Sequence, residues 1–196
     1  MKMAFFDMVN TPRVKTKRLL LRPFLVTDVN DVYEWCSSSN VTEFLFWYPH
    51  RDLDTTSRIL MKWIRKRRNY SWCLDYQGKA IGEIEVIKDL PDGGCEIGYT
   101  LNEHFWRRGF MKEALGAILL FLFVKAGYKY VKAITDERNK GSRALLRSLD
   151  FTYLPSEKDP SYFIAKKGIS VATVTYHLTW ERFSLKNAEK ISKFRC

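Results

Sequence analysis

Three runs in the middle of the chain alternate apolar and polar residues, a pattern typical of strands with one buried face. The runs are YSWCLDY at 70–76, KAIGEIEVI at 79–87 and GCEIGYTL at 94–101. Turn-forming residues separate them, with Gln77-Gly78 after the first run and Pro91-Asp92-Gly93-Gly94 where the third begins. The pattern predicts an antiparallel meander of three strands.

Four other segments place apolar residues at helical spacing. They cover residues 27–36, 54–68, 109–127 and 139–149. Thr27 is the candidate N-cap of the first helix and Asn139 that of the last, because both side chains can accept a bond from a free backbone N–H. Gly127 is a suitable residue to end the third helix.

Four further runs have strand-like patterns, and the order of all these elements predicts one mixed α/β domain. The runs are residues 18–24, 128–135, 161–167 and 171–183. We place the domain at residues 1–183, with its core at 16–183. Residues 184–196 are basic and show no clear pattern, so we expect them to form a C-terminal tail.

The composition supports a folded domain but does not identify its partner. Of 196 residues, 46% are hydrophobic and 15% are aromatic, which is enough for a sizeable core and argues against disorder. The formal net charge of +11 permits acidic partners such as nucleic acid, ribosomes, phosphorylated cofactors or acidic proteins. A basic surface that only aids solubility is the simplest interpretation of the same charge.

The cysteine, histidine and hydropathy patterns argue against a metalloprotein, a secreted protein and a membrane protein. The four cysteines lie far apart, without a CxxC pair and without a histidine at zinc-ligand spacing. The N-terminus lacks the apolar run of a signal peptide, and the apolar run at 117–124 is too short to cross a bilayer. We therefore expect no bound metal, reduced cysteines, no membrane association and a cytoplasmic location.

The stretch EHFWRRGFMKEA at 103–114 places two arginines and a glycine at the start of a long apolar helix. N–H groups of a first helical turn lack acceptors within the helix, and the helix dipole favours an anion there. Gly109 would let a phosphate approach the backbone, while Arg107 and Arg108 would add positive charge. The alternative is a glycine that only relaxes a turn beside solvated arginines. No GxGxxG or GxxxxGK[ST] motif is present, so neither a dinucleotide-binding fold nor a P-loop is indicated.

Two longer stretches resemble the GCN5-related N-acetyltransferase (GNAT) superfamily. They are CEIGYTLNEHFWRRGFMKEALGAILLFLF, starting at Cys95, and ITDERNKGSRALLRSLDF, starting at Ile134. The shared motifs are the E-I-G-Y strand, a W-x-x-G-[FY]-M-x-E-A helix start and N-x-x-S-x-x-L-L-x-x-L-x-F. The chain looks most similar to the branch with the ribosomal-protein N-terminal acetyltransferases (RimJ/RimL-like), and the similarity extends over most of residues 16–183.

The resemblance implies an acetyl-CoA-dependent transferase with a central, mostly antiparallel mixed sheet flanked by helices. It implies that backbone groups of the strand at 96–101 hold the pantetheine arm, and that amides of the helix start hold the pyrophosphate. The cofactor-binding residues implied in this way are Ile97, Gly98, Tyr99, Thr100, Leu101, Arg107, Arg108, Gly109, Phe110, Met111, Lys112 and Asn139.

Several positions depart from the usual superfamily pattern. Trp106 and Met111 are unusual in the loop motif, but binding through backbone amides tolerates both. Asp150 replaces a glycine before the last motif phenylalanine, and aspartate accepts a left-handed conformation better than most residues. Leu146 stands where many members have a tyrosine that protonates the CoA thiolate, so that route is absent.

Acetyl transfer to an amine needs a neutral amine and a proton or hydrogen bond for the leaving thiolate. Ser142 is the candidate proton donor, because it matches the serine of N-x-x-S that this branch is thought to use. Glu96 and Glu83, together with Glu85, are candidate carboxylates for relaying a proton from the amine. Each has an alternative role, Ser142 in supporting its helix start and each glutamate as the partner of an arginine.

Phe46, Trp47 and Tyr48 would flank the acceptor entrance, as the resemblance implies, although three adjacent aromatics also suit ordinary packing. The leading interpretation is acetylation of a protein N-terminus, such as that of a ribosomal protein. A small amine, such as an antibiotic or polyamine, is the second, and the net charge of +11 argues mildly against a polyamine. The third is a non-enzymatic RNA- or ribosome-binding module, for which no RNP-like or GXXG motif is present. Monomer and homodimer both stay open.

Overall fold

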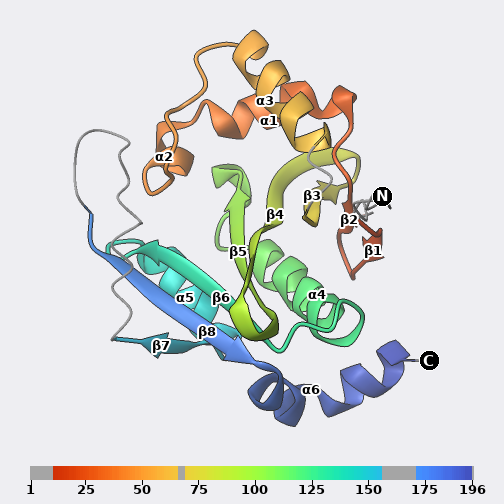
Figure 1. Cartoon of the computed structure of the whole chain (residues 1–196). Helices are drawn as coiled ribbons and strands as arrows, with labels where there is room; N and C mark the ends of the chain where they lie inside the picture. The colour runs from red at the N-terminus through yellow and green to blue at the C-terminus, as the bar shows by residue number, and fades with distance from the viewer. Residues whose placement is uncertain (1–10, 66–68, 156–170, 196) are drawn as a thin grey trace, which may run out of the picture.

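A central sheet organises the computed structural model, which describes residues 11–65, 69–155 and 171–195 (Figure 1). The strands of the described part are β1 (Val14–Lys15), β2 (Leu20–Arg22), β3 (Ser71–Tyr76), β4 (Lys79–Leu90), β5 (Gly94–Leu101), β6 (Tyr130–Asp136), β7 (Thr152–Leu154) and β8 (Thr173–Thr179). The helices are α1 (Val29–Cys36), α2 (Ser39–Thr42), α3 (Leu53–Arg65), α4 (Phe110–Val124), α5 (Lys140–Ser148) and α6 (Trp180–Arg195). Short 3₁₀ turns are η1 (Val26–Asp28), η2 (Pro91–Gly93) and η3 (Glu103–Phe105).

The strands follow the order β1-β2-β3-β4-β5-β6-β8-β7. Neighbouring strands pair antiparallel, except that β5 and β6 are parallel. The prediction of one mixed α/β domain with a mostly antiparallel sheet is confirmed. The predicted meander is confirmed as well, because β3, β4 and β5 are consecutive antiparallel neighbours.

The parallel pair of β5 and β6 is short. Residues 94–96 of β5 lie opposite residues 130–132 of β6. Beyond Glu96 the strands diverge, so β5 continues beside β4 while β6 continues beside β8 (Figure 1). The divergence opens the middle of the sheet beside the C-terminal half of β5.

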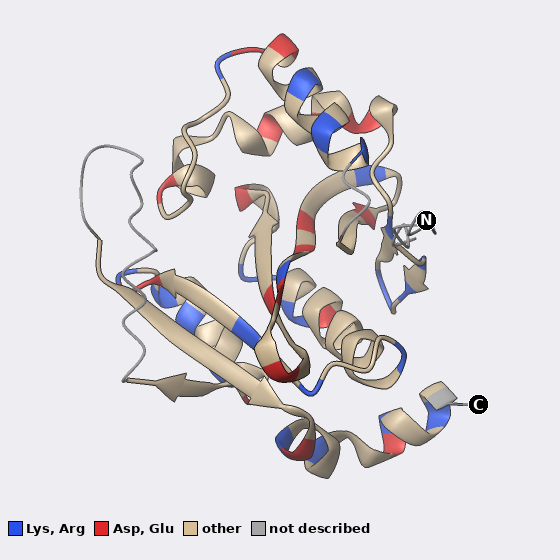
Figure 2. Cartoon of the chain, viewed as in Figure 1, with Lys and Arg blue, Asp and Glu red and all other residues tan. Residues whose placement is uncertain are grey.

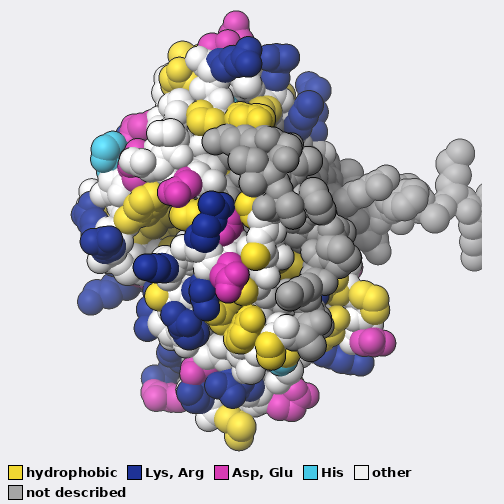
Figure 3. Space-filling model, turned by 90° about the vertical axis from the view of Figure 1, so that its left-hand side faces the viewer, with side chains coloured by type: hydrophobic (Ala, Val, Ile, Leu, Met, Phe, Trp, Pro, Cys, Tyr) yellow, Lys and Arg dark blue, Asp and Glu magenta, His cyan; other side chains and the backbone are white. Residues whose placement is uncertain are grey.

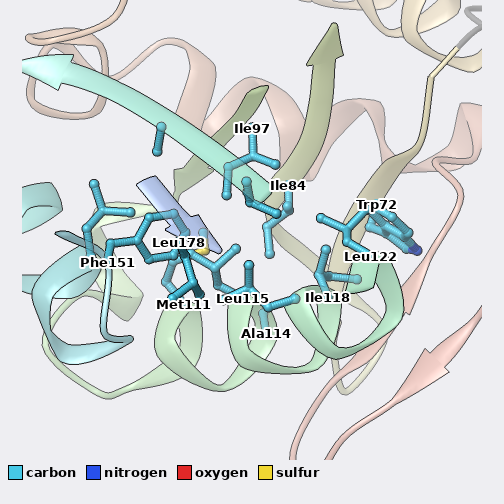
Figure 4. Packing of buried hydrophobic residues seen from close by; sticks show 14 of the residues in the cluster. Trp72, Ile84, Ile97, Met111, Ala114, Leu115, Ile118, Leu122, Phe151 and Leu178 are labelled. Atoms are coloured by element: carbon cyan, nitrogen blue, oxygen red, sulfur yellow. The ribbon is translucent and has the colours of Figure 1, made fainter. Parts of the chain in front are cut away.

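Helix α4 covers one face of the sheet and supplies much of the larger hydrophobic core. Its buried residues include Ala114, Leu115 and Ile118, which face strand residues such as Ile84 and Ile97 (Figure 4). Full burial of one such aliphatic side chain contributes about 1.5–3 kcal/mol. This packing holds the start of α4 in a fixed place beside β5.

A smaller core on the opposite face fixes α1 and α3 over β3 and β4. Trp35 stacks on Trp63 with 6.1 Å between ring centroids, and Phe24 contacts the same ring at 5.4 Å. The indole Nε1 of Trp35 donates to Ala80 O at 3.1 Å, which satisfies its one polar group. This core therefore holds the loop between α2 and α3 close to the sheet.

A buried ion cluster joins β2, β3 and the start of α1. Arg22 is 6% exposed and donates to Asp28 from Nη1 and Nη2 at 2.8 and 2.9 Å. Its Nε donates to Asp75 at 2.8 Å. Asp28 also accepts from Leu25 N at 2.7 Å, so the cluster closes the turn between β2 and α1.

Removing Arg22 should destabilise the fold strongly, because Asp28 would stay buried without its cationic partner. We expect Arg22→Ala to lower the free energy of unfolding by about 3–5 kcal/mol, as measured by urea denaturation. Arg147→Ala is the control, since Arg147 is exposed on α5, and it should change stability by less than about 0.5 kcal/mol. Equal losses in the two variants would contradict a structural role for the cluster.

Two local predictions are wrong. Thr27 does not cap α1, because it lies within η1 and the helix begins at Val29 without a side-chain cap. The run at 171–183 is not one strand, because β8 ends at Thr179 and α6 begins at Trp180. Trp180 and Phe183 lie three residues apart and both contact Phe123 of α4, a contact that helical spacing allows.

The segment expected to be a tail without pattern is also helical. Helix α6 crosses the boundary that we placed between residues 183 and 184, and it is kinked at Asn187. Its Ile191 belongs to the larger core. The predicted strand at 161–167 lies outside the described residues, and the short elements β1, α2 and β7 were not predicted. None of the described helices has the length and hydropathy needed to cross a membrane.

Candidate active site

Helix α4 begins at a loop with unusual backbone geometry. Its N-cap Gly109 has φ of 76°, and Arg107 has φ of 58°, so left-handed residues stand on either side of Arg108. Such alternation points successive N–H groups to one side, as in anion-binding nests. Within the described part of the chain, no protein acceptor receives a hydrogen bond from the N–H groups of residues 107–112. The loop therefore presents a row of donors that a pyrophosphate can satisfy.

The side chains of this loop divide between the core and the surface. Those that face the core are Phe110 and Met111, and those that are exposed are Arg107 and Lys112. Arg108 is exposed as well, but its guanidinium lies over the rings of Phe105 and Phe110, at 5.3 and 5.1 Å from their centroids. Because Phe110 and Met111 are buried, they can contact an anion only through their backbone.

An arginine from near the N-terminus clamps the same loop. Arg18 donates from its backbone N and its Nε to the Glu113 carboxylate at 2.7 and 2.6 Å, and from Nη1 to Arg108 O at 2.9 Å. Its guanidinium also lies 4.1 Å from the centroid of the Phe110 ring. Burial raises the pKa of Glu113, but bonds from Thr16 and Arg18 outweigh it and hold this pKa below its usual value. Sequence reasoning missed this clamp, although Glu113 lies within the helix-start motif.

Strand β5 presents an edge to the opening of the sheet. Its other edge pairs with β4 as far as Leu101. Beyond Glu96, no described strand pairs with the edge that faced β6. Residues 97–101, predicted as a backbone site, therefore offer one edge to an extended ligand, in the manner of an added strand.

Tyr99 on this strand reaches across the opening to α5. Its hydroxyl lies 2.7 Å from Ser142 Oγ, and either oxygen can be the donor. Ser142 is fixed from its backbone as well, because its N–H donates to the Asn139 side chain at 2.9 Å. Asn139 thus caps α5 as predicted. Burial raises the pKa of Tyr99, with an opposing effect of the Ser142 bond, so the phenol stays protonated at neutral pH. No sequence pattern indicates this side-chain contact.

Leu146, one turn after Ser142, is fully buried in the larger core. Its position explains why no polar group stands there. The side chains that meet beside the β5 opening are instead those of Tyr99 and Ser142.

A cavity of about 940 Å³ lies on the face of the sheet opposite to α4. Its floor is formed by β4 and β5, and its walls by the loop before α3 and by α3 itself. Phe46, Trp47 and Tyr48 line it, and Phe46 and Tyr48 are 64% and 56% exposed at the surface. The cavity therefore joins the C-terminal half of β5 to an aromatic mouth.

The candidate glutamates lie in different places. Glu83 and Glu85 line the cavity, and Glu83 is 8% exposed. Glu96 is 1% exposed, does not line the cavity and lies 3.3 Å from Lys88 Nζ through its Oε2. The structure thus brings Glu83 and Glu85 together with the aromatic residues, and leaves Glu96 in an ion pair elsewhere on the sheet.

Hydrogen bonds from the end of β5 position the loop that forms the wall. The Glu103 carboxylate accepts from Ser38 Oγ and from Asn40 Nδ2, both at 2.6 Å. Asn102 is 1% exposed and donates to Glu34 at 2.8 Å. These contacts tie α1 and α2 to the strand that also forms the cavity floor, and they were not predicted.

Among the described residues, neither the cysteines nor a cluster of metal-ligand side chains forms a further site. Cys36, Cys73 and Cys95 are buried free thiols, and burial raises the pKa of each. In the described ranges, no three His, Cys, Asp or Glu side chains are placed to share a metal ion. Basic residues are spread over several helices with acidic residues among them (Figure 2). The face in Figure 3 likewise mixes hydrophobic, basic and acidic side chains, without a uniformly basic surface.

Comparison with known proteins places this geometry in a family. Residues 18–152 match the family model described as an acetyltransferase (GNAT) domain. The chain is 26% identical over 143 residues to p20, an uncharacterized N-acetyltransferase of Bacillus licheniformis, and the match covers 69% of this chain and 80% of p20.

Solved structures show the same fold. A GCN5-related N-acetyltransferase from Brucella melitensis has a TM-score of 0.79 at 17% identity, over 94% of this chain and 86% of its own. RimL, a ribosomal L7/L12 alpha-N-protein acetyltransferase in complex with coenzyme A, has a TM-score of 0.75 at 18% identity, over 87% and 99%. Because the family model spans most of the chain, this protein belongs to the GNAT acetyltransferases and is an acetyl-CoA-dependent N-acetyltransferase.

Proposed function

We propose that the acceptor is the primary amine at the N-terminus of a protein. The observation that carries this proposal is the cavity of about 940 Å³ beside the β5 opening, because ligand pockets span roughly 300–1,000 Å³ and this one is near the upper limit. A small amine would fill a fraction of it, whereas several residues of a peptide would fit. Phe46 and Tyr48 at the mouth offer exposed aromatic surface on which a peptide can lie. RimL is named for ribosomal protein L7/L12, so a ribosomal protein is the first acceptor to test.

Within this proposal, the described residues have separate tasks. The N–H groups of residues 107–112 bind the pyrophosphate, and the open edge of β5 binds the pantetheine arm. Ser142 donates a hydrogen bond to the leaving sulfur, and with Tyr99 as the donor of the Tyr99–Ser142 pair the Ser142 proton is free for that bond. The amine attacks the thioester directly, so no nucleophilic side chain is needed.

A small cationic amine is the second candidate acceptor. Glu83 and Glu85 line the cavity, and their carboxylates attract an ammonium group although the whole chain is basic. The same carboxylates also attract the ammonium group of a protein N-terminus. The two acceptor classes therefore differ in the apolar part of the molecule that is attached to the amine.

Release of thiol from acetyl-CoA tests the proposal. The acceptors are peptides with free N-termini, the same peptides with blocked N-termini, spermidine and an aminoglycoside. We expect release with the free peptides and none with the blocked ones. Release with spermidine or the aminoglycoside alone would assign the enzyme to small amines. Acetyl-CoA should also raise the melting temperature in every case, since ligand linkage adds about 2.7 kcal/mol at a hundredfold excess over Kd.

The two loop arginines should contribute to acetyl-CoA binding in different ways. Arg107 is exposed and should act through charge alone, so Arg107→Ala should weaken binding about two- to fivefold at low salt and less at high salt. Arg108 also packs on Phe105 and Phe110, so part of its effect should persist at high salt. Calorimetry at low and high ionic strength measures both. A loss in Arg107→Ala that does not depend on salt would contradict this division.

A further inference from the structure

The acceptor cavity contains one histidine, His50, at the end of its aromatic loop. The residue is 7% exposed and lines the cavity. Its backbone N donates to Cys36 O at 3.0 Å, and its ring lies beside that of Trp47 with 5.1 Å between centroids. Contacts from α1 and from its own loop therefore hold the ring in place.

Two contacts decide which ring nitrogen of His50 carries the proton. Nδ1 lies 2.9 Å from Thr56 Oγ1, and Thr56 Oγ1 donates to Asp52 O at 3.3 Å. A carbonyl oxygen only accepts, so when Thr56 gives its single hydroxyl proton to Asp52 O, the hydroxyl accepts from Nδ1–H. In that arrangement the neutral ring has its lone pair on Nε2.

Nε2 is the ring nitrogen that the contacts of His50 leave available to a ligand. Nε2 makes no hydrogen bond to a described residue and is not fully enclosed, because no His50 nitrogen is among the enclosed, unbonded side-chain atoms of the described residues. Since His50 lines the cavity, we expect a group bound there to reach the Nε2 lone pair.

Burial, rather than the charges nearby, keeps His50 neutral at physiological pH. Burial lowers its pKa and the Asp52 carboxylate raises it, and the pKa stays below its usual value. Of the other titratable groups, Arg51 from its own loop and Glu83 and Glu85 from β4 line the same cavity, and Cys36 from α1 holds the His50 backbone. The Cys36 thiol is uncharged because burial raises its pKa.

We infer that His50 is the general base of the acceptor site and takes a proton at Nε2 from the ammonium form of the acceptor, directly or through one water. This role rests on the proposed function, because an α-amino group has a pKa of about 7.7–8.0 and is mostly protonated at pH 7. Loss of one proton to Nε2 frees the amine lone pair to attack the thioester carbonyl carbon. The C–N bond forms, the C–S bond breaks, a second amine proton balances the thiolate through Ser142 or solvent, and His50 returns its proton to solvent.

His50→Asn is the test variant, because its amide nitrogen can keep the bond to Thr56 while Nε2 is lost. With acetyl-CoA and a peptide bearing a free N-terminus, we expect kcat/KM at pH 7 to fall about a hundredfold, the lower range for a positioned base. At pH 9 the free amine is abundant, so the deficit should shrink below about tenfold. His104→Asn is the matched control, since His104 is exposed and outside the cavity, and it should match the parent.

Two results would overturn the assignment. A deficit of equal size at pH 7 and pH 9 would show that His50 only supports the loop. A pH-dependent deficit in Glu83→Gln or Glu85→Gln, with a normal His50→Asn profile, would make a carboxylate the base. The same pH test is run in parallel with spermidine as the acceptor. If only spermidine is acetylated, the acceptor proposal fails, but the role of His50 is still tested because the pH test applies to either amine.

Nitrogen NMR of the labelled histidines gives a readout that needs no activity. We expect the His50 signal, identified by its loss in His50→Asn, to show protonated Nδ1 and unprotonated Nε2 at pH 7. The ring should titrate below about 6.5, the unperturbed value. A ring with its proton on Nε2 would contradict the assignment whatever the acceptor proves to be.

Discussion

Replacing Ser142 by alanine should lower kcat by about ten- to a thousandfold, because a positioned proton donor contributes on the order of 10²–10⁴ and water partly substitutes. The leaving thiol has a pKa near that of free cysteine, about 8.5, so the sulfur benefits from a donor as negative charge develops. The KM for acetyl-CoA should change little, since this bond forms mainly in the transition state. Steady-state kinetics with saturating acceptor measures both constants.

The structure allows a clean control for Ser142→Ala. The cap of α5 uses the Ser142 backbone N–H and the Asn139 side chain, and alanine keeps that bond. Ser148→Ala removes a hydroxyl from the same helix, where it donates to Leu145 O at 2.8 Å on the surface, and should leave kcat unchanged. Tyr99→Phe should reproduce part of the Ser142→Ala loss, because the Ser142 hydroxyl would lose its partner. A normal kcat in Ser142→Ala would limit Ser142 to a structural role.

Replacing Gly109 by valine should weaken acetyl-CoA binding about 5- to 150-fold. Gly109 has φ of 76°, and a β-branched residue there is strained by about 1–3 kcal/mol, which corresponds to that loss at 1.4 kcal/mol per factor of ten. A Cβ would meet Arg18 Nη2 at 3.5 Å, an ordinary contact, so backbone strain and crowding of the bound phosphate are the expected causes. Calorimetry with acetyl-CoA measures the change.

Gly116→Ala is the matched control for Gly109→Val. Gly116 lies within α4, and a Cβ there would meet only Leu149 Cδ2 at 3.9 Å. Alanine is a better helix former than glycine, so this variant should bind acetyl-CoA normally and melt slightly higher. If Gly109→Val binds within twofold of the parent, the loop does not cradle the pyrophosphate.

Local patterns were sufficient for the elements around the cofactor site. Hydrophobic residues recur with different periods in strands and helices, so β3, β4, β5 and α4 could be predicted without tertiary information. Asn139 was readable as a cap because its side chain bonds a residue only three positions away, Ser142. The helix start with Gly109 was readable for the same reason, since its N–H donors and its backbone conformation belong to neighbouring residues.

The patterns failed where long-range packing decides the conformation. Residues 171–183 are rich in β-branched and aromatic residues, which favour a strand. The change to helix at Trp180 follows from the packing of Trp180 and Phe183 on Phe123 of α4, which is far away in sequence. Thr27 failed as a cap because the neighbouring Asp28 binds Arg22 and sets the turn.

By itself, the sequence determined the fold class, the family resemblance and the donor-rich start of α4, because each depends on residue type and short spacing. The tertiary structure alone decided which side chains meet. Arg18 contacts Glu113 across 95 positions and Tyr99 contacts Ser142 across 43, and no local period encodes such pairs. It also separated Glu83, in the cavity, from Glu96, outside it, and it placed His50 at the cavity wall. Those placements depend on how α1, α3 and α4 pack on the two faces of the sheet, which is decided by burial of the whole core.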